Sequence, residues 1–383
     1  MAARKPLKPH SHDVSAWITG LALIAAIGLA AWYEKPSRSS RKRPRDGHPS
    51  GRALPADEPH IVQLARANEP GRGRRAVSPF EIPVAGWRDI AWRTYAEIND
   101  DRLLAVAAGV VFYSLLALFP AITALVSFYA LFADAATIGK HLAFAADLMP
   151  AGAFGIVNEQ ISRIAQAGGG QLGSAFIIGV LLAIWSANAG MKAMIDALNV
   201  TYDETETRSF IKLNLLSLTM TLGALVLLLI AIGAVVVLPL AFSWLAIDTW
   251  GERAIALLRW PAIMIVVALA LAVLYRYGPS RRPAQWRWLS VGSIVATLLW
   301  VTGSVLFSWY LSNFADYNAT YGSLGAAIGL MMWLWLTSTA ILVGAELNAE
   351  IEHQTARDST VGSRKPLGTR GATMADTVGA AQG

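Results

Sequence analysis

Seven long stretches without a charged residue dominate the pattern of hydrophobic and polar positions along the chain. They lie at residues 16–33, 103–133, 171–191, 213–247, 260–275, 288–315 and 317–345. A helix that crosses a bilayer needs about 20 apolar residues. The stretches lack the alternation of apolar and polar positions found in membrane barrel strands, so helices are expected. The pattern predicts an all-α polytopic membrane protein.

The basic residues between these stretches predict the topology, because Lys and Arg in short loops mark the cytoplasmic side. Residues 192–212 carry three basic residues and residues 276–287 carry four. In contrast, residues 134–170 carry only two, and the segment NFADYNATYGS carries none. This alternation predicts a six-helix bundle at residues 102–350, with both ends of this core in the cytoplasm.

The first apolar stretch, residues 16–33, then becomes an extra transmembrane anchor after a short external segment, residues 1–15. It leads into residues 34–79, which are rich in Pro, Gly, Ser and basic residues and are expected to form a disordered basic linker in the cytoplasm. A cleaved signal peptide is the alternative, which we favour less because cleavage would export this basic segment. Residues 351–383 have a similar composition and are expected to form a disordered cytoplasmic tail.

Residues 80–101 have the pattern of an interfacial amphipathic helix, which lies on the membrane surface. One helical face gathers apolar side chains, among them Trp87 and Tyr95. The charged side chains, including Asp89 and Arg93, are expected to point away from that face. A second apolar stripe, at residues 154–164, is expected to form a similar helix on the outer side.

Composition narrows the chemistry that the chain can perform. The sequence is 55% hydrophobic and 15% charged, with a net charge of +6 and no cysteine. The lack of cysteine excludes disulfides, thiol catalysis and zinc–thiolate sites. The six histidines are scattered, so we predict no metal site, no cofactor and no catalytic residue. Tyrosines are the only titratable residues inside the predicted spans, which disfavours a proton-coupled carrier of a small polar solute.

Small residues and prolines mark expected packing points in the bundle. Gly325 and Gly329 form a GxxxG pair in the last predicted helix, a spacing typical of close helix contacts. Pro120 lies in the first core helix, where it removes a backbone hydrogen bond and predicts a kink.

Four separated blocks of the sequence are distinctive. They are LLAVAAGVVFYSLLALFP, MKAMIDALNVTYDETETRSFIKLNLLSL, YRYGPSRR and YNATYGSLGAAIGLMMWLWLTSTAILVGAELNAEIE. These blocks resemble the YihY/virulence factor BrkB family of integral membrane proteins, also designated UPF0761 and historically labelled ribonuclease BN. The resemblance extends over residues 87–352. It implies a six-helix protein of the bacterial inner membrane with a cytoplasmic C-terminus, and it brings no settled activity.

The resemblance also carries over a set of recurrent positions. In this sequence they are Tyr113, Pro120, Asn199, Arg208, Pro279, Tyr317, Gly322, Glu346 and Asn348. Pro279 and Gly322 join the positions expected to kink or pack the helices. Candidates for a head-group site or substrate path are Glu346, Asn348, Arg208, Asn199 and Tyr317.

We expect the protein to move a lipid or another envelope amphiphile. A lipid keeps its tails in hydrocarbon, so the protein needs to supply only a groove for the head group. Arg208 can meet a phosphate, or it can pair with Glu204 four residues earlier. Glu346 follows the predicted end of the last span by one turn, so we expect it at the cytoplasmic rim, either as a functional acid or as a boundary residue.

Two other functions stay open. A structural or regulatory scaffold would recruit partners through the basic linker, and a membrane-bound ribonuclease is the least favoured because no catalytic constellation is evident. Membrane lipids, mainly anionic, are the expected partners of the basic residues. We expect no specific nucleic acid, and the sequence leaves homo-oligomerisation open.

Overall fold

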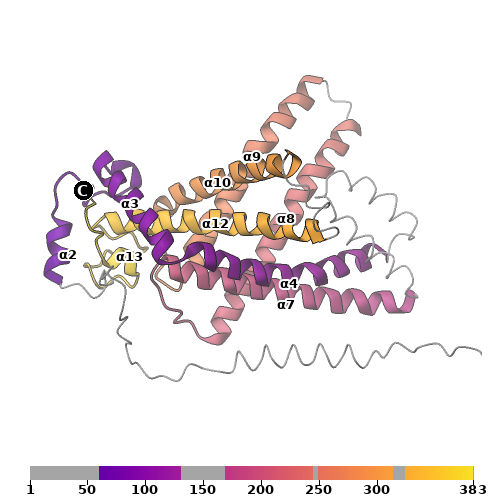
Figure 1. Ribbon diagram of the computed structural model, residues 1–383, viewed down its shortest axis with the longest axis horizontal. Helices are drawn as coiled ribbons and strands as arrows, with labels where there is room; N and C mark the ends of the chain where they lie inside the picture. The colour runs from indigo at the N-terminus through magenta and orange to yellow at the C-terminus, as the bar shows by residue number, and fades with distance from the viewer. Residues whose placement is uncertain (1–59, 131–168, 245–248, 314–323, 383) are drawn as a thin grey trace, which may run out of the picture. The chain divides into compact units, whose positions relative to one another are not determined.

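The computed structural model describes residues 60–130, 169–244, 249–313 and 324–382 (Figure 1). The predicted N-terminal segment and anchor, residues 1–33, and the outer stripe at residues 154–164 lie outside the described residues. The described elements are α2 (His60–Ala67), η2 (Pro79–Glu81), α3 (Val84–Asp100), α4 (Leu103–Ala130), α7 (Gly169–Thr201), α8 (Phe210–Trp244), α9 (Thr249–Tyr277), α10 (Trp286–Asn313), α12 (Leu324–Gln354) and α13 (Thr373–Asp376). One isolated antiparallel bridge joins Ala284 to Thr360.

The described part of the chain is helical, and five of its helices contain a segment long and apolar enough to cross a membrane. These segments are Ile177–Thr201, Phe210–Leu227, Trp260–Tyr277, Trp286–Leu311 and Ala327–Gln354. A shorter apolar segment, Leu103–Ala117, lies within α4. The prediction of an all-α polytopic protein is therefore confirmed in its class, whereas six spans plus an anchor stays a prediction.

The long helices pack in a chain of neighbours. Helix α4 lies along α7, α12 packs on both α4 and α10, and α10 packs on α9 (Figure 1). Helix α8 packs on α7 and α9. The side chains turned away from these contacts are large and apolar, as on α10, where Val305, Leu306 and Trp309 are all more than half exposed. Such a surface suits contact with lipid tails.

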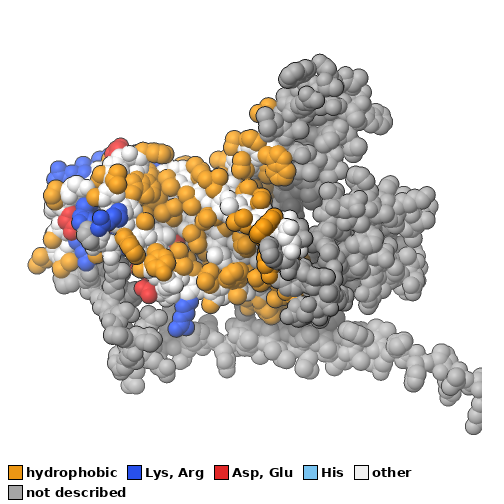
Figure 2. All heavy atoms as spheres, turned by 45° about the horizontal axis from the view of Figure 1, so that its top comes forward, with side chains coloured by type: hydrophobic (Ala, Val, Ile, Leu, Met, Phe, Trp, Pro, Cys, Tyr) orange, Lys and Arg blue, Asp and Glu red, His pale blue; other side chains and the backbone are white. Residues whose placement is uncertain are grey.

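Charged side chains gather mostly toward one end of the described bundle, whereas hydrophobic side chains cover most of the rest (Figure 2). At this end α4, α8 and α10 begin and α7, α9 and α12 end. We call it the polar end and define it as residues 93–103, 199–210, 275–289 and 342–354. Leu103, Tyr275 and Leu342 there belong to a buried apolar cluster.

Two turns at the polar end have unusual backbone geometry. Arg102, between α3 and α4, has a φ of 52°, and Asp203, between α7 and α8, has a φ of 51°. Residues other than glycine rarely adopt this left-handed conformation. Both turns place an acid at the end of a helix, because Asp101 precedes Arg102 and Asp203 is itself the left-handed residue.

The tightest helix contact joins α10 to α12 through Gly292 and Gly344. A Cβ atom on Gly344 would lie 2.5 Å from the Gly292 carbonyl oxygen and 2.8 Å from the Tyr275 hydroxyl oxygen. At Gly329, by contrast, no described atom lies within 4 Å of a Cβ position. The close approach of α10 and α12 thus involves Gly292 and Gly344 and not Gly329 of the predicted motif.

The other predicted packing positions are only partly described. Helix α4 continues without a break in its assignment through Pro120. Pro279 lies in the short connection between α9 and α10, where it cannot interrupt a helix. Gly322 and Tyr317 lie outside the described residues.

The C-terminal segment differs from the predicted disordered tail. Residues 355–382 follow the end of α12 and pack back on the protein, with Met374, Ala375 and Val378 almost wholly buried. The backbone N–H of Val378 donates to Gln63 Oε1 at 2.7 Å, and that of Gly379 donates to the His353 carbonyl at 2.8 Å. These long-range hydrogen bonds satisfy backbone groups of the C-terminal segment. From composition alone, these groups were expected to bind water.

The predicted disordered linker also differs in its C-terminal part, because residues 60–79 are packed in the structure. Arg74 is only 2% exposed. Its guanidinium donates to Glu69 Oε2 at 2.6 Å and to the Gly379 carbonyl at 2.7 Å. Part of the basic charge assigned to a linker therefore holds the two ends of the described chain together. Residues 34–59 lie outside the described part.

Helix α3 presents a different face from the predicted one. Asp89 and Arg93 are buried, at 1% and 2% exposure, and Trp92 and Tyr95 are more than half exposed. The charged side chains face inward because they meet opposite charges there: Arg72 Nη1 lies 2.7 Å from Asp89 Oδ1. The exposed aromatic side chains suit the membrane surface.

Replacing Asp376 by alanine is expected to release the C-terminal segment. The Asp376 carboxylate accepts hydrogen bonds from the backbone N–H groups of Arg370 at 2.8 Å and Gly371 at 2.9 Å. A hydrogen bond to a charged group contributes about 1.5–3 kcal/mol, so the open fraction should rise at least about tenfold. Limited trypsin digestion followed by mass spectrometry checks this, because Arg370 is 4% exposed.

The matched control for this prediction is cleavage after Arg364, which is exposed in the same segment. It should proceed at the same rate in both proteins. Equal protection of Arg370 in the variant would show that the carboxylate does not hold the segment.

Candidate functional site

Glu346 is the side chain at the polar end whose chemistry is least explained by packing. It is 0% exposed, and neither carboxyl oxygen has a hydrogen-bond partner among the residues that the structure describes. The expectation of an acid at the water boundary is therefore wrong. Counting residues placed Glu346 one turn past the predicted span, but α12 continues to Gln354 and other elements pack against it.

The residues around Glu346 on α12 form an acidic face. Glu350 follows one turn later and His353 two turns later, so the three side chains share one side of the helix. Glu350 is 1% exposed and His353 is 4% exposed. The described residues contain no group of three or more His, Asp or Glu side chains placed to hold a metal ion.

Acids on other elements also act on the Glu346 carboxyl. The charges that act most strongly on the Glu346 carboxyl are those of Glu350, Asp101, Glu97 and Asp203. Burial and the nearby Glu350 carboxylate raise the pKa of Glu97 to about 7. Burial likewise raises the pKa of Asp203. Protonated Glu97 thus favours the folded state at low pH, and this contribution is lost as the pH rises through about 7.

Glu350 is compensated, in contrast to Glu346. It forms a buried ion pair with Arg93, whose side chain is 3% exposed. The same guanidinium donates to Gln354 Oε1 at 2.7 Å and to the Ala380 carbonyl at 3.0 Å. Arg93 therefore joins α3, α12 and the C-terminal segment, and its charge is directed at Glu350.

A second buried ion pair lies on the next face of α12. Arg281 Nη2 is 2.6 Å from Glu352 Oε1, and both side chains are 0% exposed. The Arg281 guanidinium carbon also lies 4.1 Å from the centre of the Tyr202 ring, a cation–π contact. Ser359 donates to the same carboxylate at 2.8 Å.

Two of the predicted site residues, Asn199 and Arg208, meet in one hydrogen-bonded group. Asn199 Oδ1 accepts from the Ser280 backbone N–H at 2.7 Å, and Arg208 Nη2 lies 2.7 Å from Glu206 Oε2. Burial opposes ionisation of Glu206, yet the hydrogen bonds from Arg208 lower its pKa to about 2. Arg208 also donates to the carbonyl of Gly278, next to Pro279, at 2.7 Å.

This group joins the α7–α8 connection to the α9–α10 connection. The partner of Arg208 is Glu206 rather than the predicted Glu204, whose carboxylate instead accepts from the Thr373 backbone N–H at 2.7 Å. The arrangement uses the guanidinium to hold two loops together.

Asn348 also binds protein groups. Its Oδ1 accepts from the Gly292 backbone N–H at 2.8 Å, and its Nδ2 donates to the Leu289 carbonyl at 3.2 Å. It thereby fixes α12 against the first turns of α10. Of the five predicted site residues, Glu346 is thus the one without a described partner, and Tyr317 lies outside the described residues.

The sequence reasoning missed the residues that surround Glu346. Glu97 and Asp101 lie near the end of the predicted interfacial helix and Asp203 lies in a predicted loop, where an acid is ordinarily solvated. The α12 spacing of Glu346 and Glu350 was a signal for one shared face. The direction from which α3 approaches that face could not be inferred from either segment alone.

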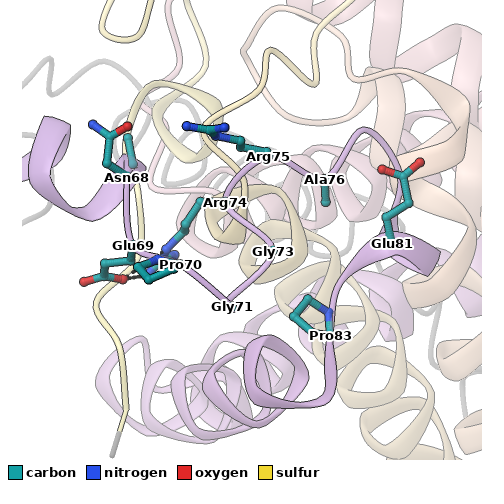
Figure 3. Close-up of a pocket in the computed structure, with 11 residues that line it drawn as sticks. Asn68, Glu69, Pro70, Gly71, Gly73, Arg74, Arg75, Ala76, Glu81 and Pro83 are labelled. Carbon is teal, nitrogen blue, oxygen red and sulfur yellow. Dashed lines mark hydrogen bonds and ion pairs between the residues drawn. The ribbon is translucent and has the colours of Figure 1, made fainter.

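Two hollows on the described surface lie away from this acid. One, of about 570 Å³, is formed by residues 67–83, and Arg74 within it points at Glu69 (Figure 3). It lies between α2 and α3, with two glycines and two prolines in its lining. The other, of about 450 Å³, is bordered by Arg88, Ala91, Trp92 and Tyr95 on α3.

Comparison with known proteins places the chain in a family context. The family model described as virulence factor BrkB matches residues 94–367. This range begins in α3 and ends in the packed C-terminal segment, so it includes the polar end except for Arg93. No solved structure matches the chain.

Three curated relatives illustrate the similarity. YfkH of Bacillus subtilis, whose name calls it ribonuclease-like, is 36% identical over 185 residues, covering 46% of this chain and 66% of that protein. A UPF0761 membrane protein of Chlorobium luteolum is 26% identical over 65% of this chain and 57% of its own length. One from Cronobacter sakazakii is 27% identical over 70% of this chain and 89% of its own length. The chain thus spans less than two thirds of the first two relatives.

Proposed function

The chain belongs to the virulence factor BrkB family of multi-pass membrane proteins, and from this premise we propose that it moves a lipid or another envelope amphiphile across the bacterial inner membrane. In this proposal the polar end faces the cytoplasm. An amphiphile keeps its tails in the bilayer, beside the exposed apolar faces of helices such as α10. Only its head group has to pass polar groups of the protein.

The observation that carries the proposal is the buried acid Glu346. Ionisable side chains within the spanning part of a membrane protein are costly and usually line a substrate or ion pathway. The ion pairs of Arg93 and Arg281 serve to hold elements together, but no described contact gives Glu346 such a role. A protein that only recruits partners at the membrane surface needs no acid of this kind.

Reconstitution tests the proposal. Purified protein in liposomes should exchange a fluorescent anionic phospholipid between leaflets faster than protein-free liposomes do. Glu346→Ala should fall to nearly the protein-free rate, whereas Glu81→Ala, at an exposed position on η2, should match the wild type. If the wild type exchanges lipids with several different head groups no faster than protein-free liposomes do, lipid movement is not the function.

The scaffold alternative makes a different prediction. Because residues 60–79 are packed against the C-terminal segment, only residues 34–58 should be deleted to test recruitment. A scaffold should lose its function in this variant, whereas a lipid mover should keep its exchange rate.

A membrane-bound ribonuclease is the third candidate function, because the name of the Bacillus relative calls that protein ribonuclease-like. We expect the purified protein to cleave no RNA in the presence of divalent metal ions. Cleavage that is lost on replacing a residue of the polar end would reverse this ranking.

A further inference from the structure

We propose that Glu346 is a proton-binding site, supplied from the protein surface through Glu97, Asp101 and Asp203. Binding moves one proton from a hydronium ion of the solvent to a Glu346 carboxyl oxygen, which leaves water and neutralises the carboxylate, so no other reactant is needed. That the proton drives movement of an amphiphile rests on the function proposed above, whereas the proton site itself stands on the geometry.

Glu346 is buried, and neither of its carboxyl oxygens has a hydrogen-bond partner among the described residues. Beside the acidic face, three of its neighbours on α12, Leu342, Ala345 and Ala349, belong to the buried apolar cluster at the polar end. An isolated carboxylate in such surroundings carries a large desolvation cost, whereas its protonated form costs far less. The arrangement therefore favours a site that is filled by a proton.

Charged and titratable groups on α12, and on the elements that pack against it, surround the Glu346 carboxyl with mainly negative charge. The acids come from α12, α3 and the two turns, while the arginines nearby already serve other acids. The charged and titratable groups are Glu350 and His353 on α12, Arg93 and Glu97 on α3, Asp101 before α4, and Tyr202 and Asp203 after α7. Arg93 pairs with Glu350, and Arg281 pairs with Glu352.

The acids that act on Glu346 are more exposed to solvent than Glu346 itself. Glu97, Asp101 and Asp203 are partly exposed, whereas Glu346 is wholly buried. The left-handed turns at Arg102 and Asp203 place two of them where the helices begin and end. Glu97, with its pKa raised to about 7 by burial and by Glu350, can gain and lose a proton near neutral pH.

The small size of a proton suits the surroundings of Glu346. The two hollows described above are lined by residues outside this cluster. The described acids and histidines are also not grouped closely enough to hold a metal ion. A proton needs neither a cavity nor several ligands at bonding distance, and it therefore fits this cluster better than a metal or an organic cation.

Infrared difference spectroscopy of the full-length protein in lipid tests the site directly. A protonated carboxylic acid has a carbonyl band that a carboxylate lacks. Exposed carboxyls are ionised at neutral pH, so the wild type should show this band there and Glu346→Gln should lack one such band. Identical bands in both proteins would show that Glu346 is ionised and would overturn the proposal.

A second variant keeps the test decisive if Glu346→Gln folds poorly. Asp203→Asn removes one negative charge that faces Glu346, so the carbonyl band should disappear at a lower pH than in the wild type. Glu81→Gln, at an exposed position outside the cluster, should leave this midpoint unchanged. An unchanged midpoint in Asp203→Asn would contradict the acidic route.

Lipid exchange under an imposed pH gradient separates this inference from the proposed function. The wild type should exchange lipid at a rate that depends on the gradient, and Glu346→Gln should lose that dependence. Exchange that ignores the gradient refutes the coupling and leaves lipid movement standing. Absence of exchange refutes lipid movement, and the infrared result still decides whether Glu346 binds a proton.

Discussion

Replacing Gly292 by alanine is expected to destabilise the bundle by about 1–3 kcal/mol, the usual cost of inserting a methyl group into a packed contact. The new Cβ atom would overlap the Gly344 carbonyl oxygen and lie 2.5 Å from Asn348 Oδ1. Both atoms belong to α12, and the hydrogen bond from Gly292 to Asn348 ties them to α10. Neither can move without separating the two helices.

Thermal unfolding in detergent micelles, followed by circular dichroism, measures this loss. Gly109→Ala on α4 is the matched control, since no described atom lies within 4 Å of its Cβ position. It should leave the melting temperature unchanged or slightly raised, because alanine favours a helix over glycine. Equal melting of the two variants would mean that α10 and α12 are not in tight contact at this point.

Arg281→Met is expected to cost about 3–5 kcal/mol, the typical penalty for removing one partner of a buried ion pair. Both side chains of the Arg281–Glu352 pair are 0% exposed, so the remaining carboxylate has no access to water. The variant also loses the cation–π contact with Tyr202. The free energy of unfolding in mixed micelles is the quantity to measure.

The double variant Arg281→Met/Glu352→Met tests the physical reason. Replacing both charges with apolar side chains removes the unpaired carboxylate, and such replacements are often nearly neutral. At least half of the single-variant loss should therefore return. If the double variant is no more stable than Arg281→Met, the loss comes from packing and not from the stranded charge.

The spanning helices were predictable because their signal is local. The charge-free run at residues 260–275, for example, becomes the span Trp260–Tyr277. Charged residues at both ends of a run limit how far it can enter a bilayer, and no partner elsewhere in the chain is needed to find it. The arginines at residues 276–287 likewise lie at one end of the described bundle, as their spacing predicted.

The polar end was harder to predict because its contacts join distant parts of the chain. Arg74 lies in a segment with the composition of a disordered linker, and its partner Gly379 lies in a segment with the composition of a disordered tail. Each segment alone buries too little apolar surface to fold. Only their combination with α12 provides hydrogen-bond partners for both.

Glu346 shows the same limit for a single site. Its position on α12 follows from counting residues along the last apolar run. Whether water reaches it depends on the elements that pack against α12, among them α3, α4 and α13. None of these is adjacent to it in the sequence, so the local pattern indicated a boundary residue where the structure has a buried acid.

The contacts of Arg93 also impose an order on biosynthesis. Glu350 is made 257 residues after Arg93, and Ala380 is made 287 residues after it. At roughly 5–20 residues per second, the ribosome adds these partners more than about ten seconds after α3 has emerged. During that interval the arginine must rely on water or on lipid phosphates. The polar end is therefore completed late, after the apolar helices have entered the membrane.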